Sequence, residues 1–123
     1  MAKPNAVLNQ TEALGLINQY RSANGLPTLT LDPELSSLAL KAANQYAKDA
    51  NNNGATALVA SNSQASPLFS AGYSNFADTF SGWRGSPRDA KTLAQTNAKR
   101  AGLAVMYAPN TSFGTHWVLL VSP

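Results

Sequence analysis

The chain has 123 residues, no cysteine and a net charge of +3. That length fits one domain, residues 1–123, whose folding buries roughly two thirds of the surface that the unfolded chain exposes. The lack of cysteine excludes disulfide frameworks, thiolate catalysis and zinc sites built on sulfur. The longest apolar run, residues 117–121, is far below the roughly 20 residues of a membrane span. We expect residues 1–8 to be an N-terminal extension and any secretory signal to have been removed already.

Positive charge is concentrated in residues 78–100, which hold five basic and two acidic side chains, while the rest of the chain is balanced. A local basic region can attract phosphates or acidic glycans, although most surface charges have no partner. Nucleic acid is not an expected partner, because it calls for a more basic protein or a recognisable reading motif.

The first predicted helix begins after a capping box. Asn9 and Glu12 have the spacing at which the Asn9 side chain accepts the backbone amide of Glu12. Residues 24–25, Asn-Gly, are typical of a left-handed helix stop. Between them runs one stripe of apolar residues three or four apart, made of Leu14, Ile17 and Tyr20.

A second helix is predicted from Asp32. Residues 26–31 alternate and contain proline, which indicates an extended connector or a short edge strand. Asp32 then caps the helix, Pro33 suits its first position and Glu34 complements its dipole. It should end near residue 50, and its buried stripe is expected to be Leu35, Leu38, Ala39, Ala42 and Tyr46.

The middle of the chain carries weaker signals. Residues 51–71 are rich in Asn, Ser, Ala and Gln with few large apolar residues, so we predict a long polar loop, a feature that is usually functional or mobile. A third helix is predicted over residues 74–83. Ser86 and Pro87 repeat the cap-then-proline pattern and predict a short fourth helix through about Leu93.

The C-terminal part predicts a β-hairpin. Residues 103–107 alternate large with small side chains, and residues 109–114 are turn formers. Residues 117–121 are nearly all apolar, which is typical of a central strand buried on both faces. Helices first and strands last predict an α+β domain in which helices cover a small sheet.

Five short motifs follow one another in a familiar order. They are Arg21 with Gly25-Leu26-Pro27, the Asp32-Pro33 helix start, Trp83 followed by Ser86-Pro87, the strand led by Gly102, and His116-Trp117. Together they resemble the CAP superfamily (cysteine-rich secretory proteins, antigen 5 and pathogenesis-related proteins), over residues 8–122 apart from residues 51–70. The bacterial, cysteine-free branch is the closer likeness.

The resemblance implies an α-β-α sandwich, with helices packed on both sides of a small, mainly antiparallel sheet. It also implies a secreted or periplasmic location, and lipid or sterol binding in some members. Anionic lipid headgroups or cell-envelope polymers therefore fit the basic region better than nucleic acid does.

The chain departs from the family where relatives build a cleft of two histidines and two acidic residues, which in some members holds a divalent ion. By spacing, relatives place histidines near residues 57–58 and at Asp89, and a glutamate near Pro67. A zinc ion needs three or four converging ligands, and this sequence offers at most Asp89 and His116. We expect a degenerate cleft without metal or other cofactor.

His116 is the single histidine. A general base needs a nucleophile and usually an orienting carboxylate within reach, so we expect instead a structural strand residue with a local hydrogen bond. Asp89 lies in the first turn of the short fourth helix, where the helix dipole accounts for a carboxylate. Its pairing with His116, as a remnant of the family site, is the alternative.

The remaining candidates lie near Trp83, which ends an apolar stripe and is expected, like Trp117, to belong to the core. Arg84, Arg88 and Lys91 are four and three residues apart and would share one face of a continuous helix, which residues 85–87 interrupt. The candidate ligand-binding set is Trp83, Arg84, Arg88, Asp89, Lys91 and His116.

We expect a non-catalytic binding or interaction domain, with a lipid or another anionic cell-envelope component as ligand and a protein as a further kind of partner. Two alternatives stay open. One is a hydrolase that uses His116 and Asp89 with a serine from residues 61–70. The other is a protein–protein interaction module that acts through residues 51–70.

Overall fold

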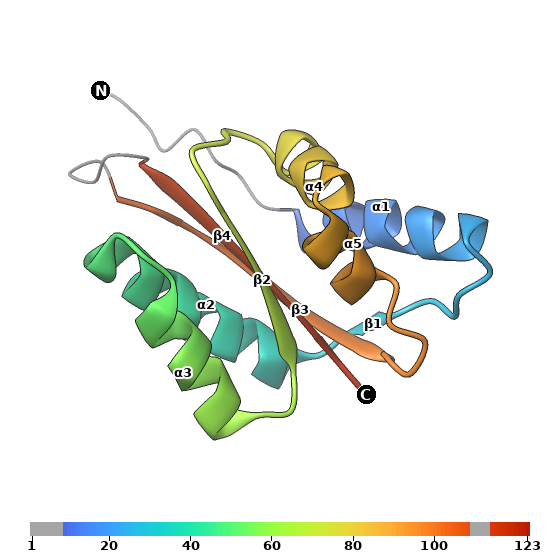
Figure 1. Ribbon diagram of the computed structural model, residues 1–123, viewed down its shortest axis with the longest axis horizontal. Helices are drawn as coiled ribbons and strands as arrows, with labels where there is room; N and C mark the ends of the chain where they lie inside the picture. The colour runs from blue at the N-terminus through green and yellow to red at the C-terminus, as the bar shows by residue number, and fades with distance from the viewer. Residues whose placement is uncertain (1–8, 109–113) are drawn as a thin grey trace.

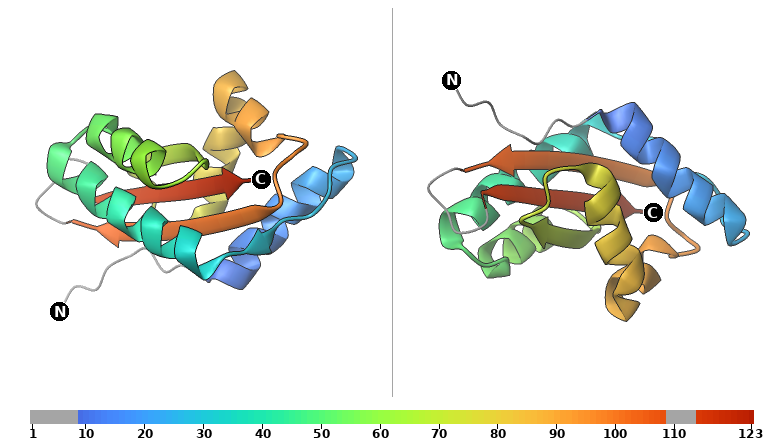
Figure 2. Two further views of the ribbon diagram at one scale, coloured as in Figure 1. Left: turned by 90° about the horizontal axis from the view of Figure 1, so that it is seen from below. Right: turned by 90° about the horizontal axis from the view of Figure 1, so that it is seen from above.

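The computed structural model describes residues 9–108 and 114–123, so the expected extension (1–8) and most of the hairpin turn lie outside it. Helices lie on both sides of one sheet, which confirms the predicted α-β-α sandwich (Figures 1 and 2). The elements are α1 (Gln10–Ala23), β1 (Thr30–Leu31), α2 (Pro33–Asp49), α3 (Asn53–Asn62), β2 (Ser66–Ala71), α4 (Phe76–Gly85), α5 (Pro87–Leu93), β3 (Arg100–Tyr107) and β4 (Thr115–Ser122).

The sheet has four strands in the order β1-β3-β4-β2. β3 and β4 form the predicted antiparallel hairpin, β2 pairs antiparallel with β4, and the two-residue β1 runs parallel to β3. All eight residues of β4 are buried, as expected of a central strand covered on both faces. None of the helices in the described part of the chain is long and apolar enough to span a membrane.

The helices begin where the sequence signals predicted. The Asn9 side chain accepts the Glu12 amide at 3.0 Å, and Asp32 accepts the Glu34 amide at 2.9 Å. α1 ends before Gly25, whose φ of +72° is readily adopted only by glycine. α5 begins at Pro87 as predicted, although the Ser86 side chain makes no capping hydrogen bond.

The predicted long loop over residues 51–71 is wrong, because this segment holds α3 and β2. α3 lacks a side-chain cap at Asn52 and buries only Ala55 and Val59. These two residues pack in the cluster formed with α2, so tertiary contact stabilises a helix whose own signals are weak. β2 pairs along its whole length with β4, and its proline is tolerated because β2 is an edge strand.

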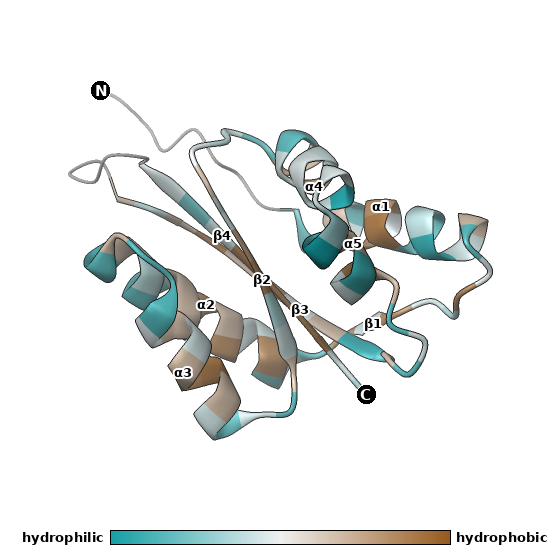
Figure 3. Ribbon diagram, in the orientation of Figure 1, coloured by the Kyte–Doolittle hydropathy of each residue, from teal (hydrophilic) through white to brown (hydrophobic). Residues whose placement is uncertain are grey.

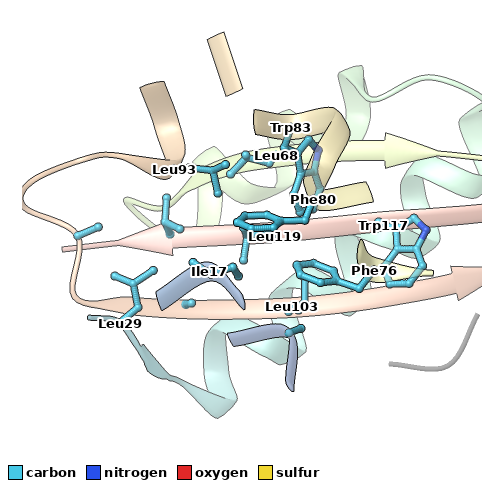
Figure 4. Close-up of a cluster of buried hydrophobic side chains, with 14 residues drawn as sticks. Ile17, Leu29, Leu68, Phe76, Phe80, Trp83, Leu93, Leu103, Trp117 and Leu119 are labelled. Carbon is cyan, nitrogen blue, oxygen red and sulfur yellow. The ribbon is translucent and has the colours of Figure 1, made fainter. Parts of the chain in front are cut away.

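Two hydrophobic clusters fill the two spaces between sheet and helices. The cluster beneath α1, α4 and α5 is built on aromatic rings, including those of Phe76, Phe80, Trp83 and Trp117 (Figure 4). The cluster beneath α2 and α3 is largely alanine and leucine. α2 and α3 carry many hydrophobic residues, while much of α5 is hydrophilic (Figure 3).

Arg21, from the first family motif, is fully buried. Its guanidinium donates to the carbonyl oxygens of Pro27 (2.8 Å), Leu93 (2.8 Å) and Ala98 (3.4 Å). Burial lowers the pKa of Arg21. The side chain thus joins α1 to the connector before β1 and to the segment between α5 and β3, which is a structural role.

Candidate functional site

The sequence-predicted site residues fall in two groups on opposite faces of the sheet. Alternate residues of β4 face opposite sides, and Trp117 belongs to the aromatic cluster whereas Val118 belongs to the α2–α3 cluster. His116 therefore faces α2 and α3, while Asp89 is on α5, which covers the other face (Figure 1). The structure does not bring Asp89 and His116 together, which corrects the pairing considered from the sequence.

His116 is packed among aromatic rings. It is buried, and its ring meets that of Tyr46 edge-on at a centroid distance of 4.9 Å, while Tyr46 in turn meets Phe69 at 5.4 Å. Within the described residues its Nδ1 atom has no hydrogen-bond partner, although hydrogen bonding to the backbone of Gly114 and Met106 acts on the ring. Burial lowers the pKa of His116, and the carbonyl groups of Gly114 and Met106 oppose that shift. Burial therefore favours the neutral form of the imidazole, which packs against the neighbouring rings.

The positions that the family resemblance predicts for cleft ligands lie on three neighbouring elements. Residues 57–58 are on α3, Pro67 is on β2 and Asp89 is on α5, and both α3 and α5 contact β2. This chain supplies one carboxylate and no imidazole there. Across the described residues, no three His, Cys, Asp or Glu side chains come close enough to hold a metal ion together.

Trp83 lies in the core rather than on a ligand surface. Its side chain is 2% exposed, and its indole N–H donates to the Phe69 carbonyl at 3.0 Å. Trp117 is also buried, and its indole N–H donates to the Tyr73 carbonyl at 2.9 Å. Both tryptophans were expected in the core, and both join the sheet region to the neighbouring segments.

Arg100 lies in the basic region of residues 78–100, but its charge is not free to bind a ligand. Its guanidinium forms an ion pair with Asp32 at 2.7 Å and donates to the Pro123 carbonyl at 3.1 Å. Desolvation would raise the pKa of Asp32, but the amides of Glu34 and Leu35 and the Arg100 guanidinium outweigh it and hold that pKa below its usual value. This contact depends on the parallel pairing of β1 with β3.

Arg84, Arg88 and Lys91 are exposed on α4 and α5. The Asp32–Arg100 contact is the only ion pair between side chains that the structure describes, so these three cations have no carboxylate partner among the described residues. Asp89 is half-buried on the same short helix. The surface is therefore positive, and its charges are available to a ligand.

One of these cations lines a groove between α1 and α4. Its volume is about 340 Å³ and its lining is Leu16, Gln19, Tyr20, Ala23, Ala77, Phe80 and Arg84. The Arg84 guanidinium lies over the Phe80 ring at 5.0 Å, and Tyr20 meets the same ring edge-on at 5.9 Å. Apolar walls thus lead to a cation that an aromatic ring holds in place.

The sequence analysis missed this groove, although one signal was present. Leu16, Tyr20 and Ala23 lie four and three residues apart in α1, beside the buried line of Ala13 and Ile17. They form a second apolar stripe, and Leu16 is 38% exposed. Such a stripe indicates a further contact surface on the helix.

A larger pocket of about 520 Å³ lies where α2 begins and α3 ends. Its charged lining residues are Asp32, Glu34, Lys41 and Arg100. Since the two cations are balanced by two carboxylates and Asp32 already binds Arg100, this pocket offers no clear preference for a charged ligand.

Comparison with known proteins gives one family match. The sequence model of the family described as "CAP: Cysteine-rich secretory protein family" matches residues 14–121. No curated protein sequence matches this chain closely enough to count as a relative.

Solved structures share the fold at low sequence identity. An outer surface protein of Borrelia burgdorferi superposes with a TM-score of 0.71 at 16% identity, over 93% of this chain and 94% of the other. An extracellular protein with an SCP domain from Bacillus anthracis gives 0.69 at 15% identity, over 92% of this chain and 40% of the other. A cysteine-rich secretory protein of Staphylococcus aureus gives 0.71 at 13% identity, over 92% and 38%. The chain therefore spans about two fifths of the length of the last two proteins.

Proposed function

We propose, from the premise that this chain belongs to the cysteine-rich secretory protein (CAP) family, that it is a non-catalytic, extracytoplasmic binding domain. Its ligand is an anionic amphiphile with a single apolar chain, and its site is the groove between α1 and α4. Arg84 binds the anionic headgroup at the rim of this groove, and Arg88 and Lys91 add to the attraction.

The observation that carries the proposal is the position of Arg84. Apolar residues alone would suit any hydrophobic partner, but the groove is also lined by a guanidinium that has no carboxylate partner in the described chain. Arginine binds carboxylates and phosphates through two parallel hydrogen bonds, which makes it well suited to a charged headgroup.

The size of the groove favours a single chain. Its volume of about 340 Å³ is at the lower end of the roughly 300–1,000 Å³ typical of small-molecule sites. A lipid with two acyl chains would leave one of them in water, which costs free energy in proportion to its exposed apolar area.

Catalysis is not part of the proposal, because the residues of the hydrolase alternative are scattered. His116 faces α2 and α3, Asp89 is on α5, and the Ser66 hydroxyl accepts a hydrogen bond from Gln95 at 3.0 Å. A nucleophile, base and orienting group must lie within hydrogen-bond reach of one another.

An extracytoplasmic location is supported by what similar structures are called. The Borrelia burgdorferi protein is described as an outer surface protein and the Bacillus anthracis protein as extracellular. A chain without cysteine can work in an oxidising environment without forming disulfides.

Titration calorimetry with dodecanoate, below its micelle concentration, tests the proposal. We expect saturable binding to the wild-type domain, and binding at least ten-fold weaker to Arg84→Gln, which keeps a polar side chain and removes the charge. Dodecanol, which has the same chain without the charge, should bind the wild type and Arg84→Gln alike.

Arg100→Gln is the matched control, because it removes one cation on another part of the surface. Equal dodecanoate affinities of wild type and Arg84→Gln would contradict the proposal, as would an equal loss of affinity in Arg100→Gln.

A further inference from the structure

Among residues 9–108 and 114–123, no strand pairs with β3 beyond Ala101 on the β1 side of the sheet. β1 pairs only with Arg100 and Ala101, although β3 continues to Tyr107 (Figure 2). The N–H and C=O groups of a strand residue point to the same side and alternate along the strand. An open edge of this kind is a template for another strand.

Two hydrogen bonds show which residues face the open side. The Ala101 carbonyl accepts the Asp32 amide at 2.9 Å, and the Leu103 carbonyl accepts the Gln10 side chain at 2.9 Å. Alternation then directs the backbone N–H and C=O of Val105 to this side as well. Within residues 9–108 and 114–123 no hydrogen bond reaches these two groups of Val105 from outside the hairpin.

A groove of about 340 Å³ runs along this edge, separate from the α1–α4 groove. Its lining is Gln10, Ser36, Ser37, Leu40, Leu103, Ala104 and Val105, so none of its lining side chains is charged. The Ser36 hydroxyl is buried and has no hydrogen-bond partner in the described chain. Leu40 is 44% exposed beside it. An exposed leucine beside an unpaired strand edge indicates a surface that a partner can cover.

We propose that this groove binds an uncharged segment of another protein in an extended conformation, which adds a strand to the open edge of β3. The peptide backbone pairs with the N–H and C=O of Val105. Side chains on one side of the peptide contact Leu40. Recognition of this kind takes affinity from backbone hydrogen bonds and specificity from alternate side chains.

The shape of the groove favours a narrow peptide over a second copy of the chain. Gln10, at the start of α1, already occupies the Leu103 carbonyl, and α2 supplies three lining residues on the other side. The stretch left unpaired on this side is therefore short and centred on Val105, which suits a few residues of an extended peptide.

The probe is a capped pentapeptide of alternating threonine and valine, added to the isotope-labelled domain while amide NMR shifts are followed. We expect the largest shifts at Leu103, Val105 and Tyr107. The same peptide with its backbone amides N-methylated keeps the side chains and loses the donors, and should bind at least ten-fold more weakly.

Val105→Pro removes one edge donor without removing a ladder bond to β4, and Val105→Ala is its matched control for lost packing. We expect Val105→Pro alone to lose at least ten-fold in peptide affinity. The inference is overturned if millimolar peptide shifts no edge amide, or if the N-methylated peptide binds as well. A domain that sediments as a dimer, with Val105→Pro monomeric, would assign the edge to a second copy instead and also overturns it.

Discussion

The two faces of the sheet are built from side chains of very different size. Toward α1, α4 and α5 the cluster contains four aromatic side chains, Phe76, Phe80, Trp83 and Trp117. Toward α2 and α3 half of the ten buried residues are alanine, namely Ala39, Ala42, Ala43, Ala55 and Ala104. Small residues let α2 approach the sheet closely, whereas large rings hold α1 and α4 further out.

This difference sets how closely the helices on each face approach the sheet. We call the face toward α2 and α3 the alanine face. A Cβ at Gly102 on this face would lie 2.2 Å from the backbone carbon of Leu35, so helix and strand touch through their backbones. We call the face toward α1, α4 and α5 the aromatic face. On this side a groove of about 340 Å³ is left between α1 and α4, and Arg84 is one of its lining residues. The alanine face is therefore the rigid support, and the aromatic face carries the proposed binding site.

The largest effect is expected at the closest contact of the alanine face. Gly102→Ala would force α2 away from β3, because backbone atoms cannot move aside as a flexible side chain can. We expect a loss of at least about 3 kcal/mol in the free energy of unfolding, the upper end of overpacking costs, measured by urea denaturation.

Gly15→Ala is the matched control, since a Cβ at Gly15 meets nothing within 4 Å. It lies inside α1, where alanine in place of glycine should stabilise the helix by about 0.5–1 kcal/mol. If Gly102→Ala were as well tolerated as Gly15→Ala, the close approach of α2 to the sheet would be disproved.

Arg21→Met should have the next largest effect. The substitution keeps an unbranched side chain but leaves the buried carbonyls of Pro27, Leu93 and Ala98 without their donor. We expect a loss of about 2–3 kcal/mol, because unsatisfied buried acceptors are costly. Thermal unfolding followed by circular dichroism checks this, and a stability equal to wild type would show that the guanidinium contributes no net stability.

These contacts also mark the limit of what the sequence could predict. Asn9, Asp32 and Pro87 predicted three helix starts correctly, because capping is decided by neighbouring residues. α3 was missed because Asn52 gives no side-chain cap and packing against α2 holds the helix. β2 was missed because its pairing partner, β4, is some fifty residues away in the chain.

The candidate site was less predictable than the fold. Trp83 and residues 88–91 were correctly placed on two consecutive helices, although α4 continues through Arg84 to Gly85. The groove depends on α1 lying beside α4, which no local pattern reports. Likewise, Asp89 and His116 lie on opposite faces of the sheet, and this depends on which face α5 covers. The parts of the fold and of the site that depend on contacts between distant segments therefore could not be predicted from local sequence patterns.

A smaller effect is expected for Trp83→Phe on the aromatic face. Phenylalanine retains most of the packing but leaves the Phe69 carbonyl without the indole donor at 3.0 Å. We expect a loss of about 1–2 kcal/mol, typical of a buried hydrogen bond together with some packing. Dodecanoate affinity should stay unchanged, because Trp83 does not line the groove. A parallel loss of dodecanoate affinity would show that the aromatic cluster and the groove are coupled.

The smallest effect is a pH dependence from the alanine face. Burial lowers the pKa of His116 below the usual 6.5, so the unfolded chain binds a proton more readily than the folded chain does. Stability is therefore complete above pH 6.5 and is lost as pH falls below it. His116→Phe should flatten the fall in stability just below pH 6.5, measured by urea denaturation at several pH values, and an unchanged slope would contradict the buried, neutral imidazole.

Amide NMR in the presence of a spin-labelled single-chain fatty acid tests the proposed ligand site most directly. We predict paramagnetic broadening of the amides of Leu16, Ala77 and Phe80, which surround the groove, while Ala43 and Val59 on the alanine face stay sharp. Broadening centred on α2 and α3, or none at saturating fatty acid, would contradict the assignment of the binding site to the aromatic face.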